Sequence, residues 1–201
     1  MHRYILALLG LLPFCGSLSA SEHRQLGAHV HGVGQFNMAI EGDRLMMELE
    51  APGMDIVGFE HAADSESDKA TMKQAKALLL AGDKVFALPV KAACKMKTRK
   101  LEIHHHHHHH EEGEGDEAHE HEHEHEHGEH EHEEGALHSE FHVSYELKCT
   151  AMDQLEQISF PYFTQFKNAH KLNVQIVTDK KQGAFVATPQ QPQVQLGALL
   201  K

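Results

Sequence analysis

The sequence predicts an α+β protein made of two small mixed α/β halves, each with antiparallel strands and one main helix, joined by a long disordered segment. Short stretches of alternating apolar residues, typical of strands, occur on both sides of residues 104–138, and each side also has one stretch with helical periodicity. His and Glu dominate residues 104–138 themselves. One continuous sheet is the alternative architecture, because the strands that enter and leave this segment both lack another partner and can pair with each other.

The chain begins with a predicted signal peptide, residues 1–20. A short basic start is followed by an apolar run and then by small residues up to Ala20. The run is too short for a permanent membrane anchor. The residues before Cys15 are not small, which argues against lipidation. No later stretch is apolar enough to cross a membrane, so we expect a soluble exported chain with no stable membrane insertion after cleavage.

The predicted N-terminal half, residues 21–103, begins with a β-hairpin. Apolar residues alternate on both sides of the turn sequence "EGDR". They are Phe36, Met38 and Ile40 before it and Leu45, Met47 and Leu49 after it. Residues 64–83 predict a helix that Ser65, Ser67 or Asp68 can cap and that Gly82 ends. Residues 84–89 and 94–103 then predict short strands.

The predicted C-terminal half, residues 139–201, has the same order of elements. Residues 139–149 predict a strand because Phe141, Val143, Tyr145 and Leu147 alternate with polar residues. Residues 153–168 predict an amphipathic helix that is interrupted near Pro161. Residues 171–179 and 183–196 predict the closing strands.

Two cysteines remain after the signal peptide, Cys94 and Cys149, an even pair in an oxidising compartment. A disulfide between them would close a loop in the unfolded chain and thereby stabilise the folded state by roughly 4 kcal/mol on the chain-entropy model. It would also tie together the two ends of the segment that holds residues 104–138. Two buried free thiols are the alternative.

The charge of the chain is concentrated in the His/Glu tract, residues 104–138. The formal net charge is −12, and the tract contains thirteen acidic residues and no Lys or Arg, so the remainder is close to neutral. Nucleic acid is not an expected partner, because no basic stripe is present to neutralise phosphates.

Fifteen of the 35 residues in the tract are His, and this composition predicts metal binding. Neutral imidazole is a common ligand for zinc, copper and nickel, and carboxylates add oxygen donors. With neither face apolar, the tract is predicted to be disordered without metal and to offer several interchangeable sites of modest affinity. Mild acid would protonate the ligands and release the metal. The candidate ligands here are His104, His105, His106, His107, His108, His109, His110, His119, His121, His123, His125, His127, His130, His132 and His138.

Three other interpretations of the tract are weaker. A purification tag would not be internal and continue into a second His/Glu block, and an acidic linker would not need His at every second position. The sequence from His119 to His123 matches the H-E-x-x-H metalloprotease motif. The match recurs in overlapping registers without an apolar face to dock a helix, so we attribute it to low complexity.

Two groups outside the repetitive part predict ordered metal sites. His29 and His31 are two residues apart on a predicted strand, so they share a face. His23 or one of Glu60, His61 and Asp64 could supply a third ligand. The second group is His138, Glu140 and His142, which also share one face of a strand. Surface histidines without metal are the alternative in both places.

Three stretches together resemble one protein family. They are "HRQLGAHVHGVGQFNMAIEGDRLMMELEAPGMDIVGFEHAA" at 23–63, the His/Glu tract, and "FPYFTQFKNAHKLNVQIVTDKKQGAFVATP" at 160–189. The chain resembles the ZrgA-type periplasmic zinc-uptake proteins of gammaproteobacteria. The resemblance implies a periplasmic zinc-binding component that works with an inner-membrane zinc permease (an ABC-type importer or similar). It also implies a mixed α/β body interrupted by the metal-binding segment.

The sequence favours a protein that captures Zn²⁺ for uptake, with the tract collecting metal and passing it to an ordered site. A metal buffer or detoxification chaperone for zinc, copper or nickel is the main alternative, and Cu²⁺ should bind the tract at least as tightly as Zn²⁺ in vitro. A metalloenzyme is a third hypothesis, but no nucleophile with a positioned base is evident, so no catalytic residue is predicted.

Overall fold

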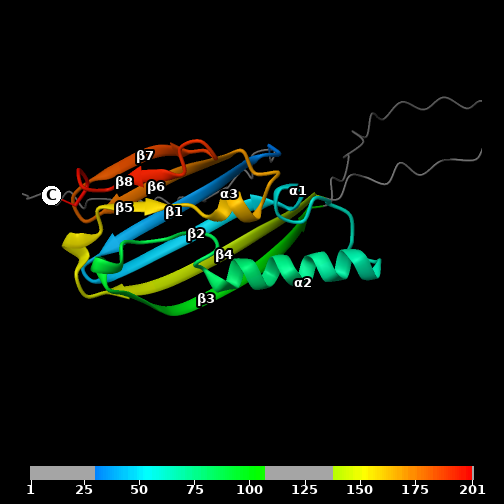
Figure 1. Ribbon diagram of the computed structural model, residues 1–201, viewed down its shortest axis with the longest axis horizontal. Coiled ribbons are helices and arrows are strands. Elements are labelled where there is room, and N and C mark those ends of the chain that lie inside the picture. Colours follow the sequence, from blue (N-terminus) through cyan, green and yellow to red (C-terminus); the bar gives the residue numbers. More distant parts are fainter. Residues whose placement is uncertain (1–29, 107–137, 201) are drawn as a thin grey trace, which may run out of the picture.

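The structure is a computed structural model that describes residues 30–106 and 138–200 (Figure 1). The predicted signal peptide, His29 and most of the His/Glu tract lie outside these residues. The main sheet has six strands in the order β3-β4-β2-β1-β6-β7. Their bounds are β1 Val33–Glu41, β2 Arg44–Pro52, β3 Cys94–His106, β4 His138–Cys149, β6 Lys171–Thr178 and β7 Gln182–Ala187.

This sheet interleaves strands from both sides of the tract. β4 lies between β3 and β2 and is antiparallel to both, while β6 is parallel to β1. The prediction of two separate halves is therefore wrong, and the alternative of one continuous sheet is confirmed. The physical reason is that the outer edges of the first hairpin expose unpaired backbone groups, and strands from after the tract satisfy them on both sides.

The β1–β2 hairpin forms as predicted. Met38 pairs with Met47 in its register, and Gly42 takes a positive φ of 57° in the turn, a conformation that glycine adopts without strain. The alternating apolar residues of both strands are buried, which fixes the register because a one-residue slip would expose all of them.

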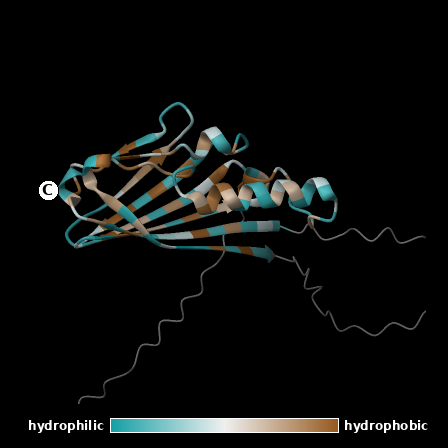
Figure 2. Ribbon diagram, turned by 60° about the horizontal axis from the view of Figure 1, so that its bottom comes forward, coloured by the Kyte–Doolittle hydropathy of each residue, from teal (hydrophilic) through white to brown (hydrophobic). Residues whose placement is uncertain are grey.

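The helices and a second, two-stranded sheet cover one face of the main sheet (Figure 2). They enclose an apolar core in which Phe36 packs against Phe86 and Phe160. The opposite face, termed the open face, presents the partly exposed alternate residues of the strands. The covering elements are α1 Gly53–Ile56, α2 Glu66–Ala81, α3 Tyr162–Gln165, and the strands β5 Gln157–Ser159 and β8 Gln193–Gln195. None of the helices in the described residues has the length and hydropathy needed to span a membrane.

The helix predicted over 64–83 is confirmed as α2. The Ser65 hydroxyl accepts a hydrogen bond from the Asp68 amide at its start, and Gly82 ends it with a positive φ of 75°. Leu79 is fully buried, and its carbonyl accepts a hydrogen bond from the Tyr145 hydroxyl at 2.7 Å. This bond joins α2 to β4.

The prediction of a helix over 153–168 is wrong, so the described residues 139–200 contain no main helix. It contains instead a 3₁₀ turn (Met152–Gln154), the strand β5 and the four-residue α3. Ile158 and Phe160 alternate into the core because residues 157–159 pair with β8, and this tertiary pairing overrides the helical pattern. The strand predicted over 84–89 is reduced to one bridge between Ala87 and Ser159.

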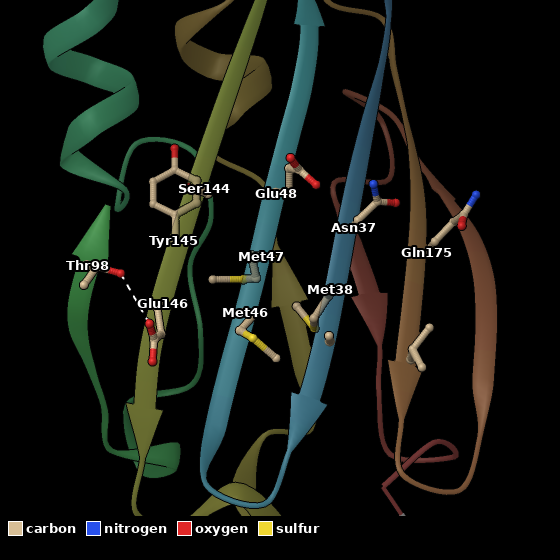
Figure 3. A pocket seen from close by; sticks show the side chains of 12 residues that line it. Asn37, Met38, Met46, Met47, Glu48, Thr98, Ser144, Tyr145, Glu146 and Gln175 are labelled. Carbon is tan, nitrogen blue, oxygen red and sulfur yellow. Dashed lines mark hydrogen bonds between the residues drawn. The ribbon is translucent and has the colours of Figure 1, made fainter. Parts of the chain in front are cut away.

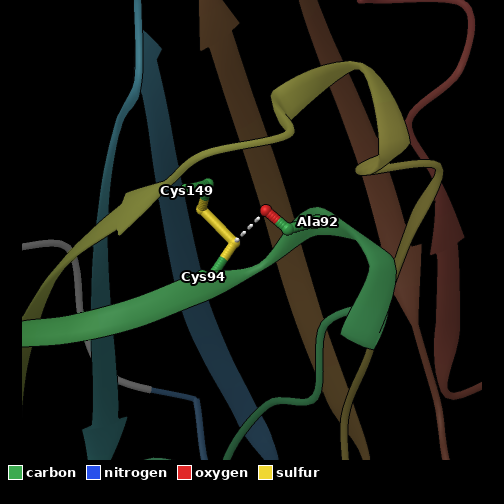
Figure 4. The surroundings of a disulfide bond; sticks show 3 residues. All are labelled: Ala92, Cys94 and Cys149. Carbon is green, nitrogen blue, oxygen red and sulfur yellow. Dashed lines mark hydrogen bonds between the residues drawn. A yellow bond between two sulfur atoms is a disulfide. The ribbon is translucent and has the colours of Figure 1, made fainter.

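The predicted disulfide between Cys94 and Cys149 is confirmed (Figure 4). These two cysteines are paired at one end of the β3–β4 ladder, and His106 and His138 are paired at the other end. The tract therefore leaves from the end opposite the disulfide. Backbone hydrogen bonds of the ladder, and not the disulfide, hold the two ends of the tract together.

Candidate metal centre

Three side chains converge where the tract meets the sheet, and we term them the tract-base cluster: His31, Glu60 and His138. Nε2 of His31 lies 2.8 Å from Oε1 of Glu60, and Nδ1 of His138 lies 2.7 Å from Oε2 of the same carboxylate. An ionised carboxylate only accepts, so each ring N–H donates to it. The two imidazole centroids are 6.4 Å apart, with Glu60 joining them.

His31 occupies a turn just before β1 and not the strand predicted for it, and its neighbour Gly32 fixes that turn. Gly32 has a φ of 83°, and a Cβ at this position would lie 2.8 Å from Cδ2 of His170. The Gly32 amide donates to Oδ1 of Asp55 at 2.6 Å. A residue with a side chain would therefore disturb both the backbone conformation and the packing that place His31.

Asp55 is buried, with a side chain that lies behind this turn. Burial raises the pKa of its carboxyl, and the bond from Gly32 and the charge of His31 oppose that shift. Its second oxygen, Oδ2, has no hydrogen-bond partner among the described atoms. Asp55 thus places a buried acidic group next to the candidate metal ligands.

Glu60 and His138 reach the cluster from different elements. Glu60 follows α1, which packs so closely on β4 that a Cβ on Gly53 would overlap the Ser139 hydroxyl. The side chain of Glu60 is only 14% exposed. His138 is both the last residue of the tract and the first residue of β4, so the tract is covalently continuous with the cluster.

The cluster fits a zinc ion. One ligand atom from each of the three side chains lies within 4.8 Å of the others. Zinc bonds nitrogen and carboxylate oxygen at about 2.1 Å, so tetrahedral ligands are roughly 3.4 Å apart, and small side-chain movements would suffice. The ion would take the place of the two ring protons that point at Glu60, and each imidazole would stay neutral with its proton on the other ring nitrogen. Two imidazoles and one carboxylate leave a fourth coordination position open.

Among the residues proposed from the sequence to accompany His31, Glu60 is found beside it. His61 instead directs Nδ1 to the carbonyl of Ala62 and stacks on Phe59. Asp64 is not in the cluster, and His23 and His29 lie outside the described residues. The cluster therefore joins His31 to a histidine of the tract, a pairing that the sequence alone did not indicate.

The group predicted at His138, Glu140 and His142 is divided in the structure. His138 contacts Glu60, whereas Nε2 of His142 lies 2.6 Å from Oε2 of Glu140. His142 also belongs to a second cluster with Glu48 and Glu50 of β2.

Sequence reasoning missed Glu48, Glu50 and Asp55. The alternation of acidic and apolar residues in "MELE" indicates that the two glutamates face outward. Only the register of β2 against β4 places them beside His142.

For most of the tract, the predicted ligands lie beyond the described residues. His104 and His105 are exposed on β3, and the backbone of His106 completes that strand. The remaining positions outside the described residues are His107, His108, His109, His110, His119, His121, His123, His125, His127, His130 and His132.

Comparison with protein families gives a match over residues 28–196 to the ZrgA family of zinc uptake proteins. This span contains the tract, the tract-base cluster and the whole of the main sheet. The chain belongs to the ZrgA family. The resemblance inferred from the sequence is thereby confirmed, and ZrgA membership gives the chain a zinc-related role. ZrgA is described as a zinc uptake family and not as an enzyme family. No curated protein matches the chain.

Proposed function

We propose that this protein captures zinc in the periplasm and supplies it to an inner-membrane zinc import system, such as an ABC-type permease. One observation carries the proposal: His138, the last residue of the His/Glu tract, contacts the same carboxylate as His31 of the folded body. A metal-collecting segment and an ordered zinc site thus share a residue.

The geometry supports transfer from the tract to the cluster. Because His106 pairs with His138, both ends of the tract start next to the tract-base cluster. Any tract imidazole that holds zinc is therefore tethered near the open fourth position, at an effective concentration that for short flexible tethers reaches millimolar. Exchange of one imidazole at a time would move the ion without releasing it to solvent.

Two other functions use the same ligands. A buffer or detoxification chaperone would also bind zinc, copper or nickel at the tract. Two histidines, one glutamate and an open position also occur in catalytic zinc sites, which is the observation that favours a metalloenzyme. The ZrgA family description favours uptake over both.

The binding step is tested by zinc titration calorimetry on the mature protein. His31→Gln and Glu60→Gln should each remove the tightest binding event and leave the weaker events of the tract. His61→Gln is the matched control, because His61 lies in the same loop but directs its ring to the Ala62 carbonyl and to Phe59 and is not part of the tract-base cluster. If the tightest event survives in both cluster variants, the tract-base cluster is not the ordered zinc site.

The direction of metal flow needs a cellular test. A strain lacking this protein should accumulate less zinc under zinc limitation, and wild-type protein should restore uptake where His31→Gln does not. Expression should rise under zinc starvation. Induction by excess zinc, with loss of zinc tolerance in the deletion strain, would support detoxification instead.

A further inference from the structure

A second group of metal-ligating side chains lies on the open face, away from the tract-base cluster. Glu50 of β2 pairs directly with His142 of β4, and Glu48 is two residues away on the same side of β2. One ligand atom from each of the three lies within 4.8 Å of the others. We term Glu48, Glu50 and His142 the open-face cluster.

The imidazole of His142 is held in one orientation. Its Nε2–H donates to Oε2 of Glu140 at 2.6 Å, and the side chain of Glu140 is only 6% exposed. The ring of His104, on the neighbouring strand β3, packs against the ring of His142, and the two ring centroids are 4.4 Å apart. With the proton on Nε2, the lone pair is on Nδ1, which lies 4.0 Å from Oε1 of Glu50. A histidine that donates one ring N–H to a carboxylate while its other nitrogen faces further ligands is the usual arrangement at protein metal sites.

The charge balance of the cluster favours a cation. Within the described part of the chain, neither Glu48 nor Glu50 forms an ion pair with Lys or Arg. The two carboxylates lie on the same face of β2, so their negative charges repel each other. Glu48 and Glu50 therefore attract positive charge to the position next to His142.

We infer that the open face carries a second ordered site for a divalent transition metal such as zinc, with Nδ1 of His142 and the carboxylates of Glu48 and Glu50 as ligands. Glu140 is a positioning residue that orients His142. The site holds one imidazole and two carboxylates, whereas the tract-base cluster holds two imidazoles and one carboxylate. It is four residues along β4 from His138, about 13 Å, so the two sites bind separate ions.

The site is partly exposed to solvent, because the side chains of His142 and Glu50 are 16% and 22% exposed. Glu48 also lines a hollow of about 510 Å³ on the open face, together with Asn37 and Met46 (Figure 3). Water can therefore complete the coordination of an ion bound there. The inference does not depend on the tract-base cluster or on the proposed function.

The test uses the full mature protein and zinc, with imidazole ¹⁵N spectra that report each ring nitrogen. On zinc addition, the Nδ1 signal of His142 should move to the metal-bound range, while Nε2 keeps its proton and its bond to Glu140. In Glu48→Gln/Glu50→Gln this response should disappear. An unchanged Nδ1 signal, a response at Nε2, or a full response in the double variant would each overturn the inference.

Three further variants separate this site from other effects. Glu146→Gln is the matched control, because Glu146 also faces outward on β4 but pairs with Arg44 and not with the cluster; it should leave the response unchanged. Glu140→Gln should weaken zinc binding at His142 about 10–100-fold, the usual effect of removing a carboxylate that orients a ligand. His31→Gln should leave the His142 response intact, and loss of that response would overturn the assignment of two separate sites.

Discussion

At the residue scale, the tract-base cluster depends on a side chain that is not a ligand. Asp55 is buried and holds the amide of Gly32, which sets the position of His31. Burying a carboxyl raises its pKa and costs stability when it is charged. Here the carboxyl orders the turn that carries a proposed zinc ligand.

Substitutions of Asp55 separate the cost of burying its charge from the contribution of its hydrogen bond with the Gly32 amide. Asp55→Ala should leave the Gly32 amide without an acceptor and destabilise the protein by about 1–3 kcal/mol. Asp55→Asn keeps an acceptor and removes the buried charge, so its stability should equal or exceed that of wild type at neutral pH. Because the folded pKa of Asp55 is raised, the advantage of Asn should grow as pH rises through that pKa. Urea denaturation measures both, and equal losses in the two variants would contradict this role.

His142 gives a second prediction, for the zinc-free protein. Its pKa is raised, chiefly by the bond to Glu140, so the folded state binds its proton more tightly than the unfolded state. The stabilisation is complete below the unfolded pKa of about 6.5 and is lost as pH rises through the folded value. With a chelator present, wild type should therefore lose stability relative to His142→Gln across this window. If the difference between the denaturation midpoints of wild type and His142→Gln does not change with pH, the His142–Glu140 pair makes no pH-dependent contribution to stability.

At the element scale, the β3–β4 pair explains how the sheet tolerates a long insertion. The ladder runs from Cys94 and Cys149 to His106 and His138, and apolar residues of β4 such as Phe141 and Val143 are fully buried against the core. β3 and β4 therefore pair through their own backbone hydrogen bonds and core contacts, and the pairing does not require a particular connecting segment.

Replacing residues 107–137 by a two-residue Asn-Gly turn tests this. The turn suits a tight antiparallel connection, and a shorter connection lowers the entropy cost of closing the loop by roughly 2 kcal/mol. The zinc-free variant should thus be at least as stable as wild type and should keep the binding event of the tract-base cluster while losing the weaker ones. Thermal unfolding and zinc calorimetry measure these properties. A variant that does not fold would show that the tract contributes to the sheet.

At the scale of the whole molecule, the disulfide and the tract-base cluster lie at opposite ends of the sheet. Eleven residue steps of β4, from His138 to Cys149, separate them, or roughly 37 Å. The disulfide constrains the unfolded chain around the insertion, while the ladder positions the metal ligands. Stability and metal binding should therefore respond separately to its loss.

Cys94→Ala/Cys149→Ala should lower the free energy of unfolding by roughly 2–4 kcal/mol. Zinc affinity of the tract-base cluster should be unchanged at temperatures where the variant is folded. Wild type treated with a reductant is the control for the lost Cys149 packing. A large fall in zinc affinity in folded protein would show that the disulfide does clamp the base of the tract.

The sequence determined much of this protein without help from the fold. The β1–β2 hairpin, α2, β3, β4 and β6 follow from local patterns, because alternation and helical periodicity report which face of an element is buried. The prediction that the tract binds metal rests on its composition, and the disulfide follows from the two cysteines that remain after the predicted signal peptide. Even Glu60 was among the candidates for the third ligand of His31.

Only the tertiary structure decided which strands are neighbours and therefore which ligands meet. Strand pairing joins residues far apart in the chain, and no local pattern specifies that β4 inserts between β3 and β2. That single placement brings His138 to His31 and Glu60, and brings His142 to Glu48 and Glu50. Pairing with β8, which no local pattern specifies, is also the reason that residues 157–159 form a strand and not the predicted helix. Local periodicity can say which way a side chain points, but a metal site needs side chains from several strands, and their register is set by the packing of the whole core.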